Sequence, residues 1–230
     1  AGGEPQFEEK SFADYHLYTM QRKTSLKENE TKQVEMARAS SVKVRKKYVY
    51  DAGMSRGQIA YWSRPNMRER PIPGKESPSK VLMKLEFENR QANNLGIPLP
   101  KGRFRIYQRD LLGGQEFVGE DIIDHTPINE KVSLVMGNAF DMVGERNQES
   151  FIILHTEKIA EETYTIEIRN QKEEAATVNV IERMFRGRQW EITKSTHYYE
   201  KLDAYTIDFE VPVGAEKSQT IQYTVRYTWM

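Results

Sequence analysis

Hydrophobic and polar residues alternate one by one along much of this chain. The clearest case is segment 220–229, where apolar positions alternate with Thr, Gln and Arg; the apolar residues are Ile221, Tyr223, Val225, Tyr227 and Trp229. A period of two is typical of a β-strand with one buried and one solvated face. The pattern recurs along the sequence, so it predicts an all-β fold.

The same reasoning predicts strands at 12–20, 42–50, 58–62, 81–89, 103–109, 115–123, 131–136, 151–159, 163–169, 176–185, 189–196 and 203–213, before the last strand. Segment 31–39 remains open between a strand and a helical turn. The glycines of LLGG at 111–114 predict a hairpin, because glycine supplies the positive φ that tight turns need. Gly137-Asn138 is expected to end the strand that begins at 131.

The spacing of these strands suggests two domains. After about residue 150 they follow one another every 8–12 residues, which is typical of a small sandwich. We therefore expect two β-sandwich-like domains. The first covers 1–148, and the second, 149–230, is immunoglobulin- or fibronectin-like. The 230 residues suffice for two cores.

Composition narrows the possible functions. Lys and Arg together balance Asp and Glu, 34 against 34, so no net positive charge steers the chain to nucleic acid. The absence of cysteine excludes disulfides, thiolate zinc sites and cysteine nucleophiles. No apolar run approaches the ~20 residues of a transmembrane segment. Residues 1–5 have neither the basic nor the apolar region of a signal peptide.

Residues 63–80 contain four prolines and five basic residues and have almost no apolar periodicity. This composition predicts a long exposed loop. A second interpretation is a basic docking loop, in which Arg64, Arg68 and Arg70 pair with an acidic protein partner.

Some aromatic residues do not follow the strand alternation. Tyr205, Phe209, Tyr223, Tyr227 and Trp229 alternate at strand spacing and are predicted to be buried in the core. Tyr61-Trp62 and His197-Tyr198-Tyr199 instead place aromatics side by side, so one of each adjacent pair is expected to be exposed. Trp62, His197, Tyr198 and Tyr199 are therefore candidates for a binding surface for protein or sugar. The alternative is that they cover the end of a core.

The strongest acidic cluster consists of Glu120, Asp121, Asp124 and His125, with Asp141 nearby in sequence. Carboxylates and an imidazole could bind a divalent metal or provide a general base. Alternatively, Asp124-His125-Thr126-Pro127 forms a structural turn whose histidine is hydrogen-bonded to a carboxylate. His16, His155 and His197 have no metal-ligand spacing, and no phosphate-binding, dinucleotide or Gly-x-Ser-x-Gly motif is present. We expect no cofactor, resident metal or catalytic residues.

Several segments resemble one bacterial family. They are YHLYTMQRKTSLKENETKQVEM (15–36), PLPKGRFRIYQ (98–108), FVGEDIIDHTPINE (117–130), GNAFDMVGERNQ (137–148), IEIRNQKEEAATVNVIERM (166–184) and WEIT (190–193). Together they are similar to a bacterial domain of unknown function. That domain forms the C-terminal half of mucoidy-inhibitor-A-like proteins and also occurs in secreted bacterial proteins. The resemblance covers nearly the whole chain and implies an all-β protein that is exported and associated with the envelope. It supplies no catalytic residues.

Three functional hypotheses follow. The first is a non-enzymatic interaction or structural module, periplasmic or extracellular, that binds protein through a loop end or an exposed strand edge. The second is a metal-dependent hydrolase or metal-stabilised module using Glu120, Asp124, His125 and Asp141. The third is a carbohydrate-binding module in which Trp62, Tyr198 and Tyr199 stack on sugar rings. Oligomeric state is not predicted.

Overall fold

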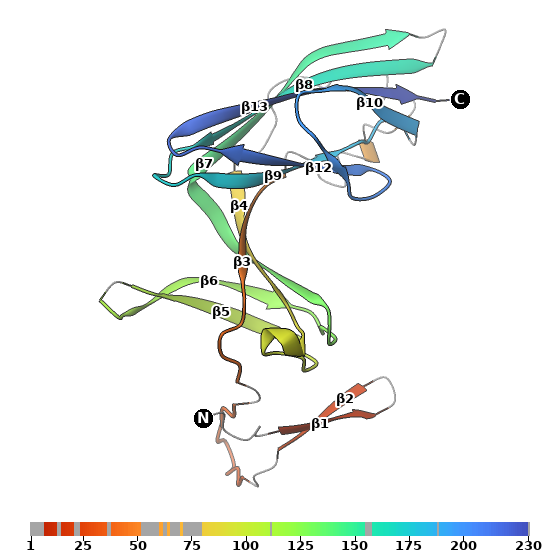
Figure 1. The fold of residues 1–230 in the computed structure, drawn as a ribbon. Coiled ribbons are helices and arrows are strands. Elements are labelled where there is room, and N and C mark those ends of the chain that lie inside the picture. The colour runs from red at the N-terminus through yellow and green to blue at the C-terminus, as the bar shows by residue number, and fades with distance from the viewer. Residues whose placement is uncertain are drawn as a thin grey trace. The chain divides into compact units, whose positions relative to one another are not determined.

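The computed structural model describes residues 7–12, 15–20, 24–35, 38–51, 60–61, 64, 70, 80–110, 112–154, 158–187 and 189–229. Strands dominate this part of the chain, which confirms the all-β prediction (Figure 1). The strands are β1 (Phe7–Phe12), β2 (Tyr15–Met20), β3 (Arg45–Asp51), β4 (Lys80–Glu88), β5 (Gly102–Arg109), β6 (Gln115–Ile123), β7 (Lys131–Leu154), β8 (Ile159–Asn170), β9 (Ala176–Arg183), β10 (Gln189–Ser195), β11 (Glu200–Lys201), β12 (Thr206–Val213) and β13 (Lys217–Thr228). One 3-10 helix, η1, covers Gln91–Asn93.

Nine of these strands form one mixed sheet, in the order β10-β13-β8-β7-β4-β3-β9-β12-β11. β3 pairs with β9 in parallel, whereas β8 pairs antiparallel with both β7 and β13. β1 with β2 and β5 with β6 form two separate two-stranded sheets. Two sandwich domains are not shown by the described residues.

The chain divides into two compact units of interleaved segments. The first unit comprises 1–45, 86–104 and 121–134, and the second comprises 46–85, 105–120 and 135–230. The boundary predicted at residue 148 falls inside β7 and stays a prediction. In the described part of the chain, no helix is long and apolar enough to cross a membrane.

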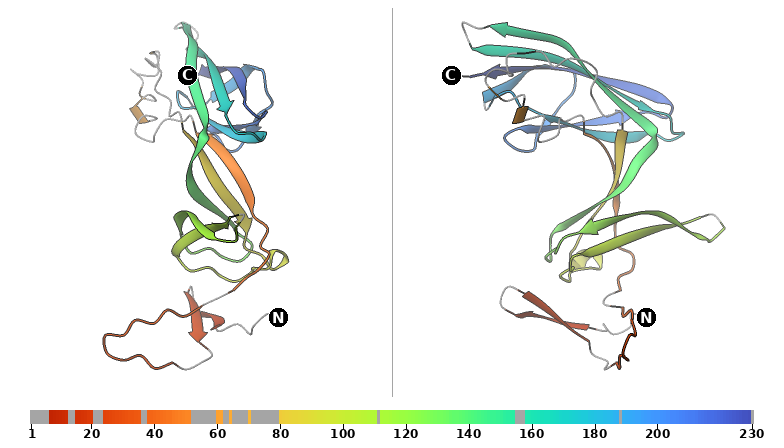
Figure 2. Two further views of the ribbon diagram at one scale, coloured as in Figure 1. Left: turned by 90° about the vertical axis from the view of Figure 1, so that its left-hand side faces the viewer. Right: turned by 180° about the vertical axis from the view of Figure 1, so that it is seen from behind.

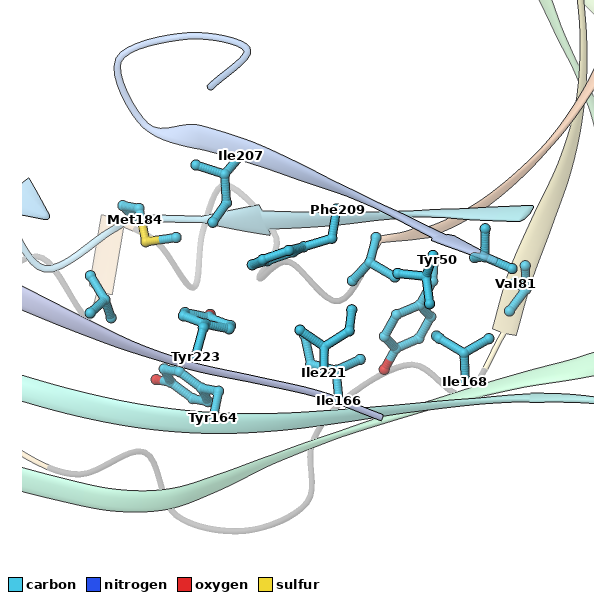
Figure 3. Packing of buried hydrophobic residues seen from close by; sticks show 14 of the residues in the cluster. Tyr50, Val81, Tyr164, Ile166, Ile168, Met184, Ile207, Phe209, Ile221 and Tyr223 are labelled. Carbon is cyan, nitrogen blue, oxygen red and sulfur yellow. The ribbon is translucent and has the colours of Figure 1, made fainter. Parts of the chain in front are cut away.

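The second unit contains the main core. The alternation of residues along its strands determines which side chains are buried there. Every second residue of β8 from Ala160 to Asn170 is buried, and β12 buries Ile207, Phe209, Val211 and Val213. β12 also contacts β8 and β13, with which it does not pair. Figure 3 shows Ile207 and Phe209 above the side chains of Tyr164, Ile166, Ile221 and Tyr223, so apolar faces from different parts of the sheet meet in this core.

Some local predictions need correction. Tyr205 was expected in the core but is 44% exposed, because β12 begins only at Thr206 and the backbone N–H of Tyr205 is bound to Asp203 Oδ1 in the preceding turn. β7 does not end at Gly137-Asn138 but continues to Leu154, with Gly137 at φ +120°. The described residues of 31–39 form neither strand nor helix. Ala60 and Tyr61 are helical, while the rest of the strand predicted at 58–62 lies outside the described residues.

Candidate functional site

The predicted acidic cluster is partly a structural turn. Asp124 Oδ1 lies 3.0 Å from Lys101 Nζ, and Thr126 Oγ1 donates to the backbone oxygen of Asp124 at 2.9 Å. His125 Nδ1 accepts a hydrogen bond from the backbone N–H of Lys101 at 3.2 Å, so its partner is not the carboxylate that the turn interpretation expected. A backbone bridge between Leu99 and Thr126 completes the turn.

The other acidic residues have different surroundings. Glu120 Oε2 lies 3.4 Å from Arg105 Nε, and Asp121 Oδ1 accepts from the backbone N–H of Ile122 at 2.8 Å. Asp141 is exposed on β7. Glu120 and Asp141 belong to the second unit, whereas Asp124 and His125 belong to the first. Among the residues that the structure describes, no group of three or more His, Cys, Asp or Glu side chains could hold a metal ion.

Only part of the predicted basic docking loop is described. Arg64 and Arg70 are both exposed, and the guanidinium carbon of Arg64 lies 5.7 Å from the ring centre of Tyr61. Trp62 and Arg68 lie outside the described residues. The docking role of this loop stays a prediction.

The His197-Tyr198-Tyr199 segment connects β10 and β11. Tyr198 is 87% exposed, whereas the ring of Tyr199 packs edge-on against Phe209 at 6.0 Å between centres. One aromatic of this adjacent pair is therefore exposed and the other packs on the core. The ring nitrogens of His197 contact Thr196 Oγ1 at 2.9 Å and Gln219 Nε2 at 3.3 Å, so this histidine is tied into the turn.

The sequence also predicts the β5–β6 hairpin, and the structure confirms it. Asp110 closes the turn: its backbone N–H donates to Gly114 O at 2.9 Å, and its Oδ1 accepts from the backbone N–H groups of Leu112 and Gly114 at 2.9 and 2.6 Å. Gly113 adopts φ +88°, which favours glycine. The carboxylate of Asp110 thus holds the hairpin turn closed.

An aromatic pair lies on this hairpin, and the sequence reasoning missed it. The rings of Tyr107 on β5 and Phe117 on β6 meet edge to face, with centres 5.7 Å apart and planes at 66°. Tyr107 is 53% exposed and Phe117 55%, while Leu112 at the turn is 95% exposed. We call Tyr107, Leu112 and Phe117 the hairpin surface. The equal distance of Tyr107 and Phe117 from the centre of the turn was the signal that could have found them.

Gly119 brings the hairpin close to β7. A Cβ atom at Gly119 would lie 3.0 Å from the backbone oxygen and 3.1 Å from Cε of Met136, which is itself buried. A side chain at Gly119 would therefore be tight against Met136, and glycine suits this close approach. β6 is held against β7 at this point, while the hairpin surface remains largely accessible to solvent.

The strand edges of the hairpin are a second feature that bears on binding. Among the described strands, β5 and β6 pair only with each other; Figure 2 draws them as a yellow-green hairpin. The outer edge of a strand carries backbone N–H and C=O groups that can pair with a further strand. Exposed aromatics beside an open edge are an arrangement suited to binding an extended peptide.

Comparison with models of known protein families, with curated proteins and with solved structures finds no match to this chain.

Proposed function

We propose that this chain is a non-enzymatic protein-interaction module that binds an extended segment of a partner protein at the β5–β6 hairpin. The observation that carries the proposal is the hairpin surface, which lies on a two-stranded sheet of the described strands. The partner's backbone would pair with one edge, and its apolar side chains would cover Tyr107 and Phe117.

The energetics support this use of the hairpin. An isolated two-stranded hairpin is marginally stable, so an added third strand gains backbone hydrogen bonds and stabilises the other two. Tyr107 and Phe117 are each about half exposed. Covering the rest of each ring would contribute about 2 kcal/mol per ring. These two contributions favour a strand with apolar side chains over a purely polar ligand.

The cellular location and the finer fold are part of the same proposal. The resemblance to the bacterial envelope family supports a periplasmic or extracellular protein whose partner is found in the envelope. The strand spacing after residue 150 supports an immunoglobulin- or fibronectin-like arrangement in the C-terminal region.

The test is an affinity capture with the full chain as bait and envelope extract from a bacterial host as source, quantified by mass spectrometry. The test variant is Tyr107→Ser with Phe117→Ser. The matched control is Tyr198→Ser with Tyr205→Ser, which removes two exposed tyrosines elsewhere, 87% and 44% exposed.

We expect the hairpin variant to lose at least about tenfold of the captured partner while the control variant retains it. Circular dichroism and the melting temperature verify that both variants fold. Equal capture by both variants would overturn the proposal. Capture of glycan instead of protein, lost in the control variant, would favour the carbohydrate hypothesis over it.

A further inference from the structure

A pocket in the first unit has a marked charge imbalance. Its volume is about 340 Å³, which is within the range of small-ligand sites. Its lining contains four cationic side chains and two carboxylates; these are Lys43, Arg45, Arg90, Lys131, Glu86 and Glu88. The whole chain has equal numbers of basic and acidic residues, so the positive excess is a property of this pocket.

Ion pairing among the lining residues leaves most of the positive charge of the pocket in place. Arg90 Nε lies 2.7 Å from Glu88 Oε2, so this cation and this carboxylate neutralise each other. Within the described part of the chain, the side chains of Lys43, Arg45 and Lys131 have no ion-pair partner. Three cations and the carboxylate of Glu86 therefore remain around one cavity, and an anionic ligand would lower the repulsion among the cations.

Two asparagines hold the pocket in shape. Asn93 is buried, and its side chain accepts from Lys43 N at 2.8 Å and donates to Lys43 O at 3.3 Å and Glu88 O at 3.0 Å. Asn94 donates to Ser41 O at 3.3 Å. The segment that contains Lys43 is therefore fixed to the end of β4 before any ligand arrives, which reduces the entropic cost of binding.

One wall of the pocket is apolar. Phe87 lines it and packs against Phe104 with ring centres 6.1 Å apart, and Val44 and Ala92 also contribute to the lining. A ligand that fits this lining has an anionic head group and an apolar body. Arginine suits such a head group, because its planar guanidinium binds carboxylate and phosphate oxygens with two hydrogen bonds.

We infer that this pocket binds a small organic oxyanion, with a carboxylate or phosphate head group held by Lys43, Arg45 and Lys131 and an apolar part against Phe87. The site is independent of the hairpin surface and does not rest on the function proposed above.

The test is isothermal titration of the full chain at constant ionic strength with three probes: phenyl phosphate, phenylacetate and inorganic phosphate. We expect saturable binding of at least one phenyl probe, and the preferred probe distinguishes a phosphate from a carboxylate head group. Binding of the phenyl probe is expected to be tighter than that of inorganic phosphate because of the apolar wall.

Substitutions then locate the site. Arg45→Gln and Lys131→Gln are each expected to weaken binding about tenfold. Lys194→Gln, at an exposed position on β10, removes the same charge from the second unit and should leave binding unchanged. The inference is overturned if no probe binds saturably, or if Lys194→Gln weakens binding as much as the pocket substitutions do. Unchanged melting temperatures verify that the variants fold.

Discussion

Arg146 on β7 and Glu182 on β9 form a buried ion pair: Nε of Arg146 donates to both carboxylate oxygens, each at 3.0 Å. Their side chains are 13% and 1% exposed. The guanidinium carbon also lies 3.6 Å from the ring centre of Tyr164, and the hydroxyl of Tyr223 donates to Glu182. Burial lowers the pKa of Arg146, but Glu182, Tyr164 and Tyr223 together outweigh it, and the pKa is raised well above the ordinary value.

Arg146→Met should therefore be strongly destabilising. It leaves the Glu182 carboxylate in the core without its cation, and breaking a buried pair costs about 3–5 kcal/mol in the free energy of unfolding. Denaturant unfolding measures this loss. A matched control is Arg226→Met, which breaks the more exposed pair with Glu161, where Nη2 and Oε1 are 2.7 Å apart. That change should cost about 1 kcal/mol or less.

The double variant Arg146→Met, Glu182→Leu removes both charges together. Since apolar residues often replace a buried pair without loss, it should recover most of the stability that Arg146→Met loses. A double variant no more stable than Arg146→Met, or equal losses for Arg146→Met and Arg226→Met, would contradict this interpretation of the core.

Tyr164 connects this pair to a second one. Its hydroxyl donates to Glu162 Oε1 at 2.8 Å, and the same oxygen accepts from Gln148 Nε2 at 2.7 Å and lies 2.6 Å from Arg186 Nη2. The side chains of Glu162 and Arg186 are both fully buried. The core of the second unit thus contains two carboxylates and two guanidinium groups among its tyrosines.

The buried tyrosines predict a loss of stability at alkaline pH. Burial, and then the nearby glutamates, raise the pKa of Tyr164, Tyr223 and Tyr227 above the ordinary value of 10.0. The folded state therefore retains phenol protons that the unfolded state releases. Their contribution to stability is complete below pH 10 and is lost as the pH rises above it.

Denaturant unfolding below, at and above pH 10 measures this effect, and the free energy of unfolding should fall across the series. Tyr227→Phe removes one of the three phenols and should make the fall shallower. An absorbance titration in which all tyrosines of the intact fold ionise together near pH 10 would refute the assignment.

Gly144 on β7 leaves space for the ring of Tyr50 on β3. A Cβ atom at residue 144 would collide with Cδ2 and Cε2 of Tyr50, and Tyr50 is fully buried. Gly144→Ala must displace the ring, and overpacking of this kind costs about 1–3 kcal/mol. The melting temperature should fall accordingly.

Gly102→Ala is the matched control, because the nearest atom to its added Cβ is 3.9 Å away. Adding Tyr50→Leu to Gly144→Ala should recover part of the loss. Equal melting temperatures for the two alanine variants would show that the Gly144 contact is not tight.

Asn89 connects three backbone segments of the first unit. It is fully buried; its Nδ2 donates to Ile97 O at 2.7 Å and Pro127 O at 2.9 Å, and its Oδ1 accepts from Gly96 N at 3.1 Å. Asn89→Ala leaves these backbone groups without their partner and should cost about 3 kcal/mol or more in unfolding free energy. Asn94→Gly, at an exposed position with φ +56°, loses one bond of 3.3 Å to Ser41 O without backbone strain and should cost well under half as much. Denaturant unfolding compares the two, and similar losses would argue against this role of Asn89.

The alternation of residues was enough to place Tyr223 and Tyr227 in the core, because a strand fixes which side each residue faces. The alternation along β8 and β9 likewise places the side chains of Glu162 and Glu182 in the core. Sequence reasoning treats such polar residues as solvent-facing, since their burial is favourable only when a cation reaches them. The partner of Glu182 comes from β7, 36 residues earlier in the chain, and nothing local predicts that pairing.

The hairpin surface and the pocket also differ in how far the local sequence predicts them. The hairpin surface is local: Asp110 pairs with Gly114 across the turn, and this register places Tyr107 opposite Phe117. The pocket brings together residues 43–45, 86–93 and 131, so it depends on contacts that no single stretch of sequence encodes. Glu120 and Asp124 are close in sequence, yet their carboxylates pair with Arg105 and Lys101 respectively.

Hydrogen exchange of the backbone amides, with and without the captured protein partner, tests strand addition to the hairpin most directly. The expected result is slower exchange along one outer edge, in Arg105–Arg109 or in Gln115–Gly119, with unchanged exchange in β10 and β13. Protection confined to β10, β13 or the His197–Tyr199 segment, with the hairpin amides unaffected, would contradict the proposed binding mode.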